Sequence, residues 1–252
     1  MSAFFFELGR FSLFFREIWH TLLNTKHNLR PIIAQTSEVT IRSLSTVVFS
    51  GFFVGGILVV QFNAVLAQYD AQIFLGGLNT SALIREVGPL IISFLLAGKV
   101  GAFTAAELGT MRVTEQIDAI ECLGTNPIQY LILPRFFGIV LASMILLSTG
   151  LLVSVIGSMG FATALCGLNP LQFAQSIPRF TDITTLLSGF LRAAIYGVIV
   201  AGVCCYQGYT ATGGAKGVGR AVTRAAIYTN LYIVIANYIT GLWIHLLLGE
   251  SS

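Results

Sequence analysis

Long apolar runs, separated by shorter polar stretches, organise this sequence. A helix needs about 20 apolar residues to cross the hydrocarbon core of a bilayer. Five runs reach that length, and we predict spanning helices over residues 43–68, 81–104, 131–161, 182–208 and 225–248. We expect a polar linker over residues 24–42 before the first span. Between the spans we expect external segments over residues 69–80 and 162–180 and a glycine-rich loop over residues 209–224.

The first 24 residues have a different pattern. Apolar side chains recur there at helical spacing, at Phe4, Leu8, Phe11, Phe15, Ile18 and Leu22. Charged residues interrupt the run, which excludes the unbroken apolar core of a signal peptide. We predict an amphipathic helix over residues 1–24 that lies in the membrane interface with its phenylalanines in lipid. Packing of this helix against the bundle is a compatible alternative.

Residues 105–135 form a polar, helix-patterned island between two apolar runs. An apolar stripe contains Val113, Ile117, Ile120 and Leu123, and an acidic stripe contains Glu115, Asp118 and Glu121. Gly124 is a plausible C-cap, and Pro127 follows soon after it. The pattern predicts one amphipathic helix over residues 107–124. Such a helix lies on a membrane surface, docks on a soluble partner, or is solvated without a partner.

Composition identifies the class of protein. The chain is 55% hydrophobic and 10% charged, with a mean hydropathy of +0.82. Soluble domains carry roughly 25% charged residues, so this chain has too little charge to cover a surface that faces water. We therefore predict an all-α integral membrane protein. The net charge of +3 is too small to argue for nucleic acid binding.

The distribution of basic residues predicts an orientation. With the N-terminus in the cytoplasm, 11 of the 14 basic residues lie on that side. Both the 105–135 island and the 209–224 loop then face the cytoplasm. Only Arg85, Arg179 and Arg192 remain for the far side or the spans.

Several kinds of chemistry have no support in the sequence. The four cysteines lack zinc or redox spacing, and the three histidines form no cluster. The glycine-rich stretches at 97–101 and 213–219 lack the spacing of a phosphate-binding loop. We expect no catalytic residue, no metal and no cofactor, and no ATP binding by this chain.

One face of the first span suits a lipid. Leu58, Phe62, Val65, Leu66 and Tyr69 share that face toward its outer end, and Gln61 borders it. Arg85 and Glu86 begin the second span, near the level of a headgroup, and Lys99 lies near its end. The alternatives are packing against neighbouring helices and snorkelling of the charges to the interface. On the first span, Gly51 and Gly55 form a small-residue motif for contact with another helix.

Several motifs, in a specific order and separation, resemble one known family. EQIDAIECLGTNPIQYLILPR is preceded by REVGPL, AGKVGAF and AAELGTMRVT, and TATGGAKGVGRAVT follows later. From about residue 40 to 245 the chain resembles the MlaE/YrbE permeases of ABC transporters, especially the plastid and cyanobacterial-type members. Lys99 stands where the family usually has arginine, which keeps the charge but loses the planar guanidinium.

The resemblance implies a function as well as a fold. It implies an N-terminal interfacial helix and five transmembrane helices in a homodimer, with the first span beside the dimer axis. A cytoplasmic coupling helix between the second and third spans would dock in a groove of a separate ABC ATPase subunit, which binds the ATP. On this chain, the ATPase-coupling residues would be Glu107, Arg112, Glu115, Asp118, Ala119 and Glu121.

The resemblance also implies a cargo and a membrane. The family moves phospholipids or related lipids between membranes, with MCE-domain substrate-binding proteins on the outer side. Leu58, Gln61, Phe62, Val65, Leu66, Tyr69, Arg85 and Glu86 would contact the lipid. The membrane would be a bacterial inner (plasma) membrane or a plastid inner envelope. Two alternatives remain: a secondary transporter or channel that needs no ATPase, and a non-transporting scaffold. Secondary transporters usually contain internal repeats, and we find no convincing repeat.

Overall fold

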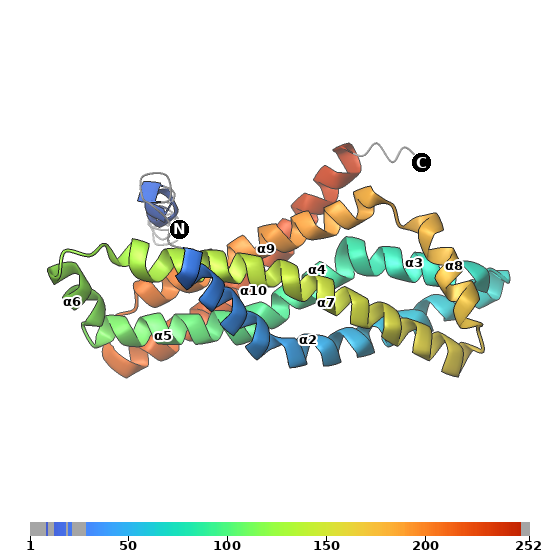
Figure 1. Ribbon diagram of the computed structural model, residues 1–252, viewed down its shortest axis with the longest axis horizontal. Helices are drawn as coiled ribbons and strands as arrows, with labels where there is room; N and C mark the ends of the chain where they lie inside the picture. Colours follow the sequence, from blue (N-terminus) through green and yellow to red (C-terminus); the bar gives the residue numbers. More distant parts are fainter. Residues whose placement is uncertain (1–8, 10–12, 19, 22–28, 248–252) are drawn as a thin grey trace. The chain divides into compact units, whose positions relative to one another are not determined.

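Helices make up almost all of the described part of the chain. A computed structural model describes residues 9, 13–18, 20, 21 and 29–247, and all their regular elements are helices (Figure 1). Among the described residues, five stretches are long and apolar enough to cross a membrane: Leu29–Tyr69, Gln72–Val113, Ile128–Cys166, Ile183–Tyr209 and Gly214–Trp243. The predicted all-α class and five spans are therefore confirmed. The predicted interfacial helix over 1–24 lies largely outside the described residues, of which 13–18 are helical.

The first two spans contain most of the irregular helical turns. The first consists of α2 (Leu29–Leu66) and the 3₁₀ turn η1 (Ala67–Tyr69). The second contains η2 (Gln72–Phe74), α3 (Leu75–Ala82), η3 (Leu83–Val87), α4 (Gly88–Leu96), η4 (Ala97–Gly101) and α5 (Ala102–Val113). Both η3 and η4 are π-helical. Turns of this kind mark one extra residue in a helix and are frequent at functional sites.

The remaining elements complete the bundle. They are α6 (Gln116–Cys122), the π-helical η5 (Ile128–Ile132), α7 (Leu133–Cys166), α8 (Pro170–Phe180), α9 (Ile183–Tyr209) and α10 (Gly214–Leu247). Asn169 caps α8, because its side chain accepts a hydrogen bond from the Leu171 amide at 2.9 Å. Pro170 occupies the first helical position, where a missing N–H costs nothing.

Several helices extend beyond the apolar runs that predict them. α2 includes most of the predicted polar linker, and α10 includes most of the predicted loop over 209–224. A helix satisfies its own backbone hydrogen bonds, so it continues through polar sequence until a turn or proline ends it. In the expected external turn at 69–80, the chain reverses near Asp70, which has a left-handed φ of 51°. Most of the rest of that segment is helical.

Contacts divide the chain into two compact units, each built from separate segments. Unit 1 comprises Met1–Thr40, Leu96–Ala142 and Gly197–Tyr232, and unit 2 comprises Ile41–Leu95, Ser143–Tyr196 and Ile233–Ser252. The island over residues 105–135 and the glycine-rich loop over residues 209–224, both predicted to be cytoplasmic, belong to unit 1. The predicted lipid-facing residues belong to unit 2.

In unit 1, small residues bring α5 and α9 into close contact. A Cβ added at Gly208 would lie 2.7 Å from the Cβ of Leu108 and 3.0 Å from the carbonyl oxygen of Ala105. At Gly101, the last residue of η4 just before α5, a Cβ would lie 2.5 Å from the Sγ of Cys204 on α9. The two helices therefore meet almost backbone to backbone, with no space for a larger side chain at either glycine.

The described N-terminal residues also pack within unit 1. The ring of Phe14 lies 5.6 Å from that of Tyr206 and 5.9 Å from that of Tyr209. Phe15 packs edge-on against Phe136. Within residues 13–18, both phenylalanines thus contact other helices of the bundle. This is the packing that we gave as the compatible alternative to a helix with its phenylalanines in lipid.

In unit 2, the glycines of α2 lie against α7. A Cβ at Gly55 would lie 2.2 Å from the carbonyl oxygen of Ser154, and one at Gly51 would lie 2.9 Å from that of Gly150. The small-residue motif predicted from Gly51 and Gly55 is therefore a helix contact, as expected.

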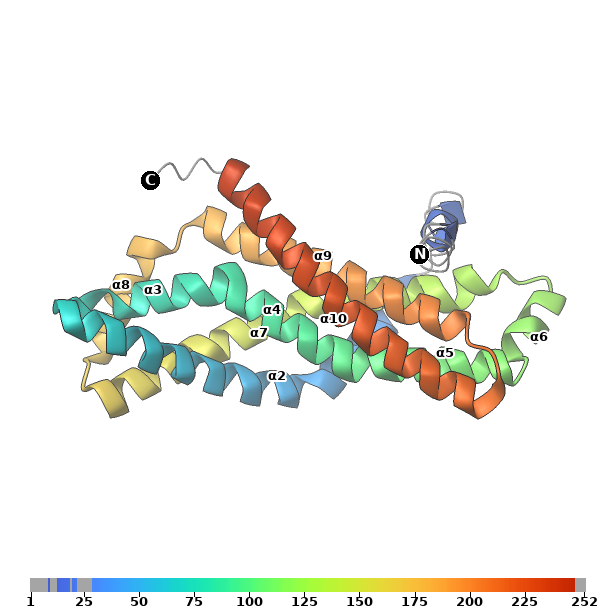
Figure 2. The same ribbon diagram turned by 180° about the vertical axis from the view of Figure 1, so that it is seen from behind.

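A second close contact in unit 2 joins α3 to α8, which lie side by side in both views (Figures 1 and 2). A Cβ at Gly76 would lie 2.2 Å from the carbonyl oxygen of Phe173. The amide of Gly77 donates a hydrogen bond to the Oγ of Ser176 at 2.9 Å. A buried cluster of Val59, Leu75, Ala162 and Phe173 forms the apolar core beside this contact.

Candidate functional site

The predicted coupling segment is bent rather than straight. We call residues 102–122 the elbow, because α5 ends at Val113 and α6 begins at Gln116. Glu115 lies between them in the left-handed region, with a φ of 60°. That conformation is uncommon for residues other than glycine. The single helix expected over 107–124 is therefore two helices. Ile117 anchors the second one, with its side chain fully buried.

Arg112 holds the bend together. Its Nη1 atom donates to the Oδ1 of Asp118 in an ion pair that connects α5 to α6. Its guanidinium carbon also lies 5.6 Å from the centre of the Tyr209 ring, in a cation–π contact with the last residue of α9. The hydroxyl of Tyr209 donates in turn to Glu121 of α6, over 3.4 Å. One arginine thus joins three helices.

The other predicted coupling residues divide into paired and exposed ones. Glu107 accepts a hydrogen bond from Arg135 at 2.9 Å, which connects α5 to the start of α7. Glu115 and Ala119 are exposed. The acidic stripe is therefore not uniform, because Asp118 and Glu121 contact other parts of the same unit. Leu123, from the expected apolar stripe, is 83% exposed.

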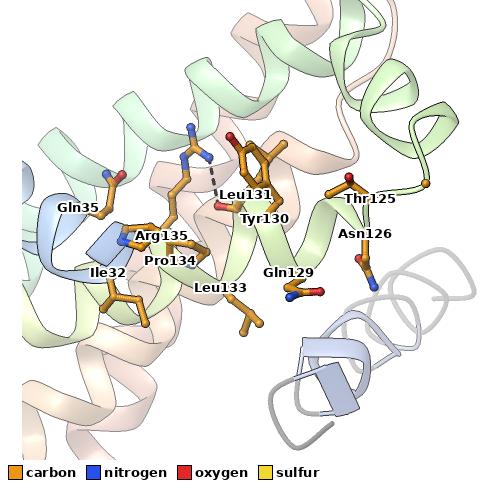
Figure 3. Close-up of a pocket in the computed structure, with 12 residues that line it drawn as sticks. Ile32, Gln35, Thr125, Asn126, Gln129, Tyr130, Leu131, Leu133, Pro134 and Arg135 are labelled. Atoms are coloured by element: carbon orange, nitrogen blue, oxygen red, sulfur yellow. Dashed lines mark hydrogen bonds between the residues drawn. The ribbon is translucent and has the colours of Figure 1, made fainter. Parts of the chain in front are cut away.

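A cavity of about 590 Å³ lies beside the elbow in unit 1. Figure 3 shows Ile32 and Gln35 of α2 on one side and Thr125 and Gln129 on the other. Its wall includes Arg135, whose Nη1 donates to the carbonyl of Leu131 at 3.1 Å (Figure 3). Sequence reasoning missed this cavity, because two segments that are distant in the sequence line it.

The predicted lipid face on α2 lies in unit 2 and is divided. Phe62 and Leu66 pack against the buried apolar cluster, and Leu58 is half-buried. Gln61, Val65 and Tyr69 remain exposed, Tyr69 by 77%. This second group is the more accessible part of the face in a single chain.

Charged and polar side chains form a network at η3 in unit 2. Arg85 donates to the Oγ1 of Thr185 over 3.4 Å, and Glu86 pairs with Arg192 at 3.5 Å. The adjacent Arg85 and Glu86 thus contact different partners on α9. Lys99, the third charge in this span, lies on η4 and is exposed.

Arg192 is the central residue of that network and is only 3% exposed. Its Nη1 atom donates to the Oδ1 of Asn237 over 3.3 Å, and the same oxygen accepts from the Tyr196 hydroxyl at 2.7 Å. A buried guanidinium needs such acceptors, because its desolvation is costly. Sequence reasoning left Arg192 on the far side or in a span and assigned it no partner, because its partners come from other helices.

These arrangements provide binding surfaces and mechanical links. In the described residues, no group of three or more His, Cys, Asp or Glu side chains could hold a metal ion.

Comparison with known proteins places these features in a family. The family described as Permease MlaE matches residues 32–243. A probable ABC transporter permease protein of Synechocystis is 35% identical over 222 residues, which are 88% of this chain and 84% of the relative. Protein TRIGALACTOSYLDIACYLGLYCEROL 1, chloroplastic, of Arabidopsis thaliana is 32% identical over 218 residues, 86% of this chain and 62% of the relative.

A third relative has a more specific name. The intermembrane phospholipid transport system permease protein MlaE of Haemophilus influenzae is 28% identical over 209 residues, 82% of this chain and 80% of the relative. The family match covers most of each of the five candidate spans together with the elbow and the α9–α10 loop. On this evidence, the chain belongs to the MlaE permease family.

Proposed function

We propose that this chain is the membrane-embedded permease of an ABC transporter that moves phospholipids or related lipids between membranes. A separate ATPase subunit drives the movement and binds the ATP. The family match carries the proposal, because it covers the elbow and η3 as well as the spans. The names of the cyanobacterial and Haemophilus relatives support an ABC permease and a phospholipid cargo.

The elbow is the proposed docking element for the ATPase. Its exposed surface contains Glu115, Gln116 and Ala119, and the exposed Leu123 follows directly after it. Glu115 supplies an acidic group for charge-assisted hydrogen bonds to basic residues of a partner. Asp118 and Arg112 act behind this surface by holding α6 in place, as Glu107 does through Arg135.

Charge reversal on the exposed surface tests the docking role. Glu115→Lys combined with Ala119→Arg leaves the Arg112 ion pair intact, and should release the ATPase during purification. Asp182→Lys, an exposed acidic residue between α8 and α9, is the matched control and should leave the complex intact. Normal assembly and normal ATP hydrolysis in the double variant would show that the elbow is not the docking element.

The proposed lipid contact is the exposed part of the α2 face. Val65 and Tyr69 offer apolar surface, and Gln61 offers a polar group beside them. A homodimer with two-fold symmetry would bring two copies of this face together around a pocket open to the outer side. Arg85 and Glu86 would lie near the headgroup, and an MCE-domain protein would exchange lipid there. The membrane would be a bacterial inner (plasma) membrane or a plastid inner envelope.

Photo-crosslinking tests the lipid contact. A photoreactive residue at Val65 or Tyr69 should capture phospholipid more strongly than one at Leu152 of α7, which is 66% exposed. Equal labelling at the three sites would indicate contact with bulk lipid and would remove the pocket from the proposal. Native mass spectrometry should show two copies of the chain. Lipid movement without ATP would instead favour a secondary transporter or channel, and no lipid movement a scaffold.

A further inference from the structure

Tyr209 occupies a junction in unit 1. Its ring lies 5.6 Å from the guanidinium carbon of Arg112 on α5 and 5.9 Å from the ring of Phe14 in the N-terminal segment. Its hydroxyl donates to Glu121 on α6. As the last residue of α9, it joins that span to three other segments.

The covalent connections of α6 explain why such a junction matters. Through the chain itself, α6 is connected to α5 by Thr114 and Glu115, and to α7 by residues 123–127 and η5. No chain connection joins α6 directly to α9, so a displacement of α6 reaches that span through contacts between helices. Tyr209 supplies such contacts, both directly to Glu121 and through Arg112, which also holds Asp118.

The helices behind Tyr209 are suited to move together. Gly208, the preceding residue, lies against the backbone of Ala105 on α5. Leu108 is fully buried beside it. Close-packed interfaces of this kind shift as rigid pieces rather than deform gradually.

We propose that Tyr209 is a positioning residue that transmits displacement of α6 to α9, with its ring on Arg112 as the contact that carries it. This inference rests on the proposed function, since it assumes that an ATPase moves α6. The ring carries the effect rather than the hydroxyl, because the hydroxyl contact at 3.4 Å is long for an O–H···O hydrogen bond.

The coupling test compares variants in the complete complex with its ATPase. Tyr209→Leu removes the aromatic face, whereas Tyr209→Phe keeps it and removes only the hydroxyl. For Tyr209→Leu we expect normal assembly and ATP hydrolysis, but a fall of about 3- to 30-fold in lipid transferred per ATP. Tyr209→Phe should restore that ratio. Tyr238→Leu, an exposed tyrosine on α10, should leave it unchanged.

A second measurement uses the chain without its ATPase. Cys122 on α6 is exposed, whereas Cys204 and Cys205 are buried. With Cys166 replaced by serine, a nitroxide label on Cys122 reports the mobility of α6. Tyr209→Leu should increase that mobility and Tyr209→Phe should not. This result is independent of transport, so it tests the junction even if the wild-type complex moves no lipid and the proposed function fails.

Two outcomes would overturn the proposal. One is an unchanged transfer ratio and unchanged label mobility in Tyr209→Leu. The other is a Tyr209→Phe variant as defective as Tyr209→Leu, which would assign the effect to the hydroxyl. If Tyr209→Leu fails to assemble, the mobility comparison on the chain alone decides between these results.

Discussion

Replacing Gly55 with alanine tests the contact between α2 and α7 most directly. The added methyl carbon would lie 2.2 Å from the carbonyl oxygen of Ser154 and 2.7 Å from the Oγ of Ser158. Ser158 also accepts a hydrogen bond from Asn79 at 2.8 Å, so it is not free to turn away without loss. The two helices would therefore have to separate.

A second glycine isolates the cost of that separation. Gly160 on α7 has nothing within 4 Å of the position that a Cβ would occupy. Both Gly→Ala changes gain about 1 kcal/mol of helix propensity, which cancels in the comparison. The difference in the free energy of unfolding is then the overpacking cost, about 1–3 kcal/mol. At about 2–4 °C for each kcal/mol in a chain of this size, Gly55→Ala should melt about 2–12 °C below Gly160→Ala.

The native cysteines provide the assay. With the exposed Cys122 replaced by serine, a thiol-reactive dye in detergent reports exposure of Cys166, Cys204 and Cys205 on heating. These thiols sample both units, since Cys166 packs against the apolar cluster of unit 2. Equal melting temperatures for Gly55→Ala and Gly160→Ala would refute the reasoning, because α2 and α7 could then separate at no cost.

Three further predictions concern the network, the topology and a helix cap. Asn237→Leu removes the acceptor that the buried Arg192 guanidinium and the Tyr196 hydroxyl share, leaving them only the longer contacts to Glu86 and Thr240, and should cost about 1–3 kcal/mol. Glu86→Gln, at a side chain 61% exposed, should cost under about 1 kcal/mol, and dye melts compare the two. Single cysteines at Thr125 and Thr212, in a cysteine-free background, should react only from the cytoplasmic side; labelling from outside intact cells contradicts the orientation. Asn169→Ala should cost about 1 kcal/mol and Asn169→Ser much less; equal melting would exclude capping.

Hydrophobicity alone predicted the class and the spans, because crossing a bilayer imposes a minimum apolar length on a helix. The contact at Gly55 was also predictable, since a glycine in an apolar span has few uses other than close helix approach. The ends of the helices were not. α2 and α10 continue through polar sequence, and nothing in an apolar run indicates where the flanking helix stops.

The elbow shows why the site was only partly predictable. A regular stripe of acidic residues assumes one helix, but Glu115 adopts a left-handed conformation and ends that regularity. Two contacts of Arg112 hold the bend: the ion pair with Asp118 and the cation–π contact with Tyr209, a residue far away in the sequence. Arg192 was missed for the same reason, because Asn237 and Glu86 come from other helices. Pairings of this kind depend on the fold.

The π-turn η3 makes the length of the second span a constraint in its own right. The amide of Gly88 bonds to the carbonyl of Leu83, five residues back, so the turn accommodates one surplus residue. Deleting a residue from the regular helix between the turn and Ile92 would rotate one side of the span against the other by about 100°. Gly76 could then no longer face α8 while Ile92 contacts Gly150 of α7. A deletion within η3 itself would remove the surplus residue and keep both faces in register, so the turn should tolerate the loss of one residue better than α4 does.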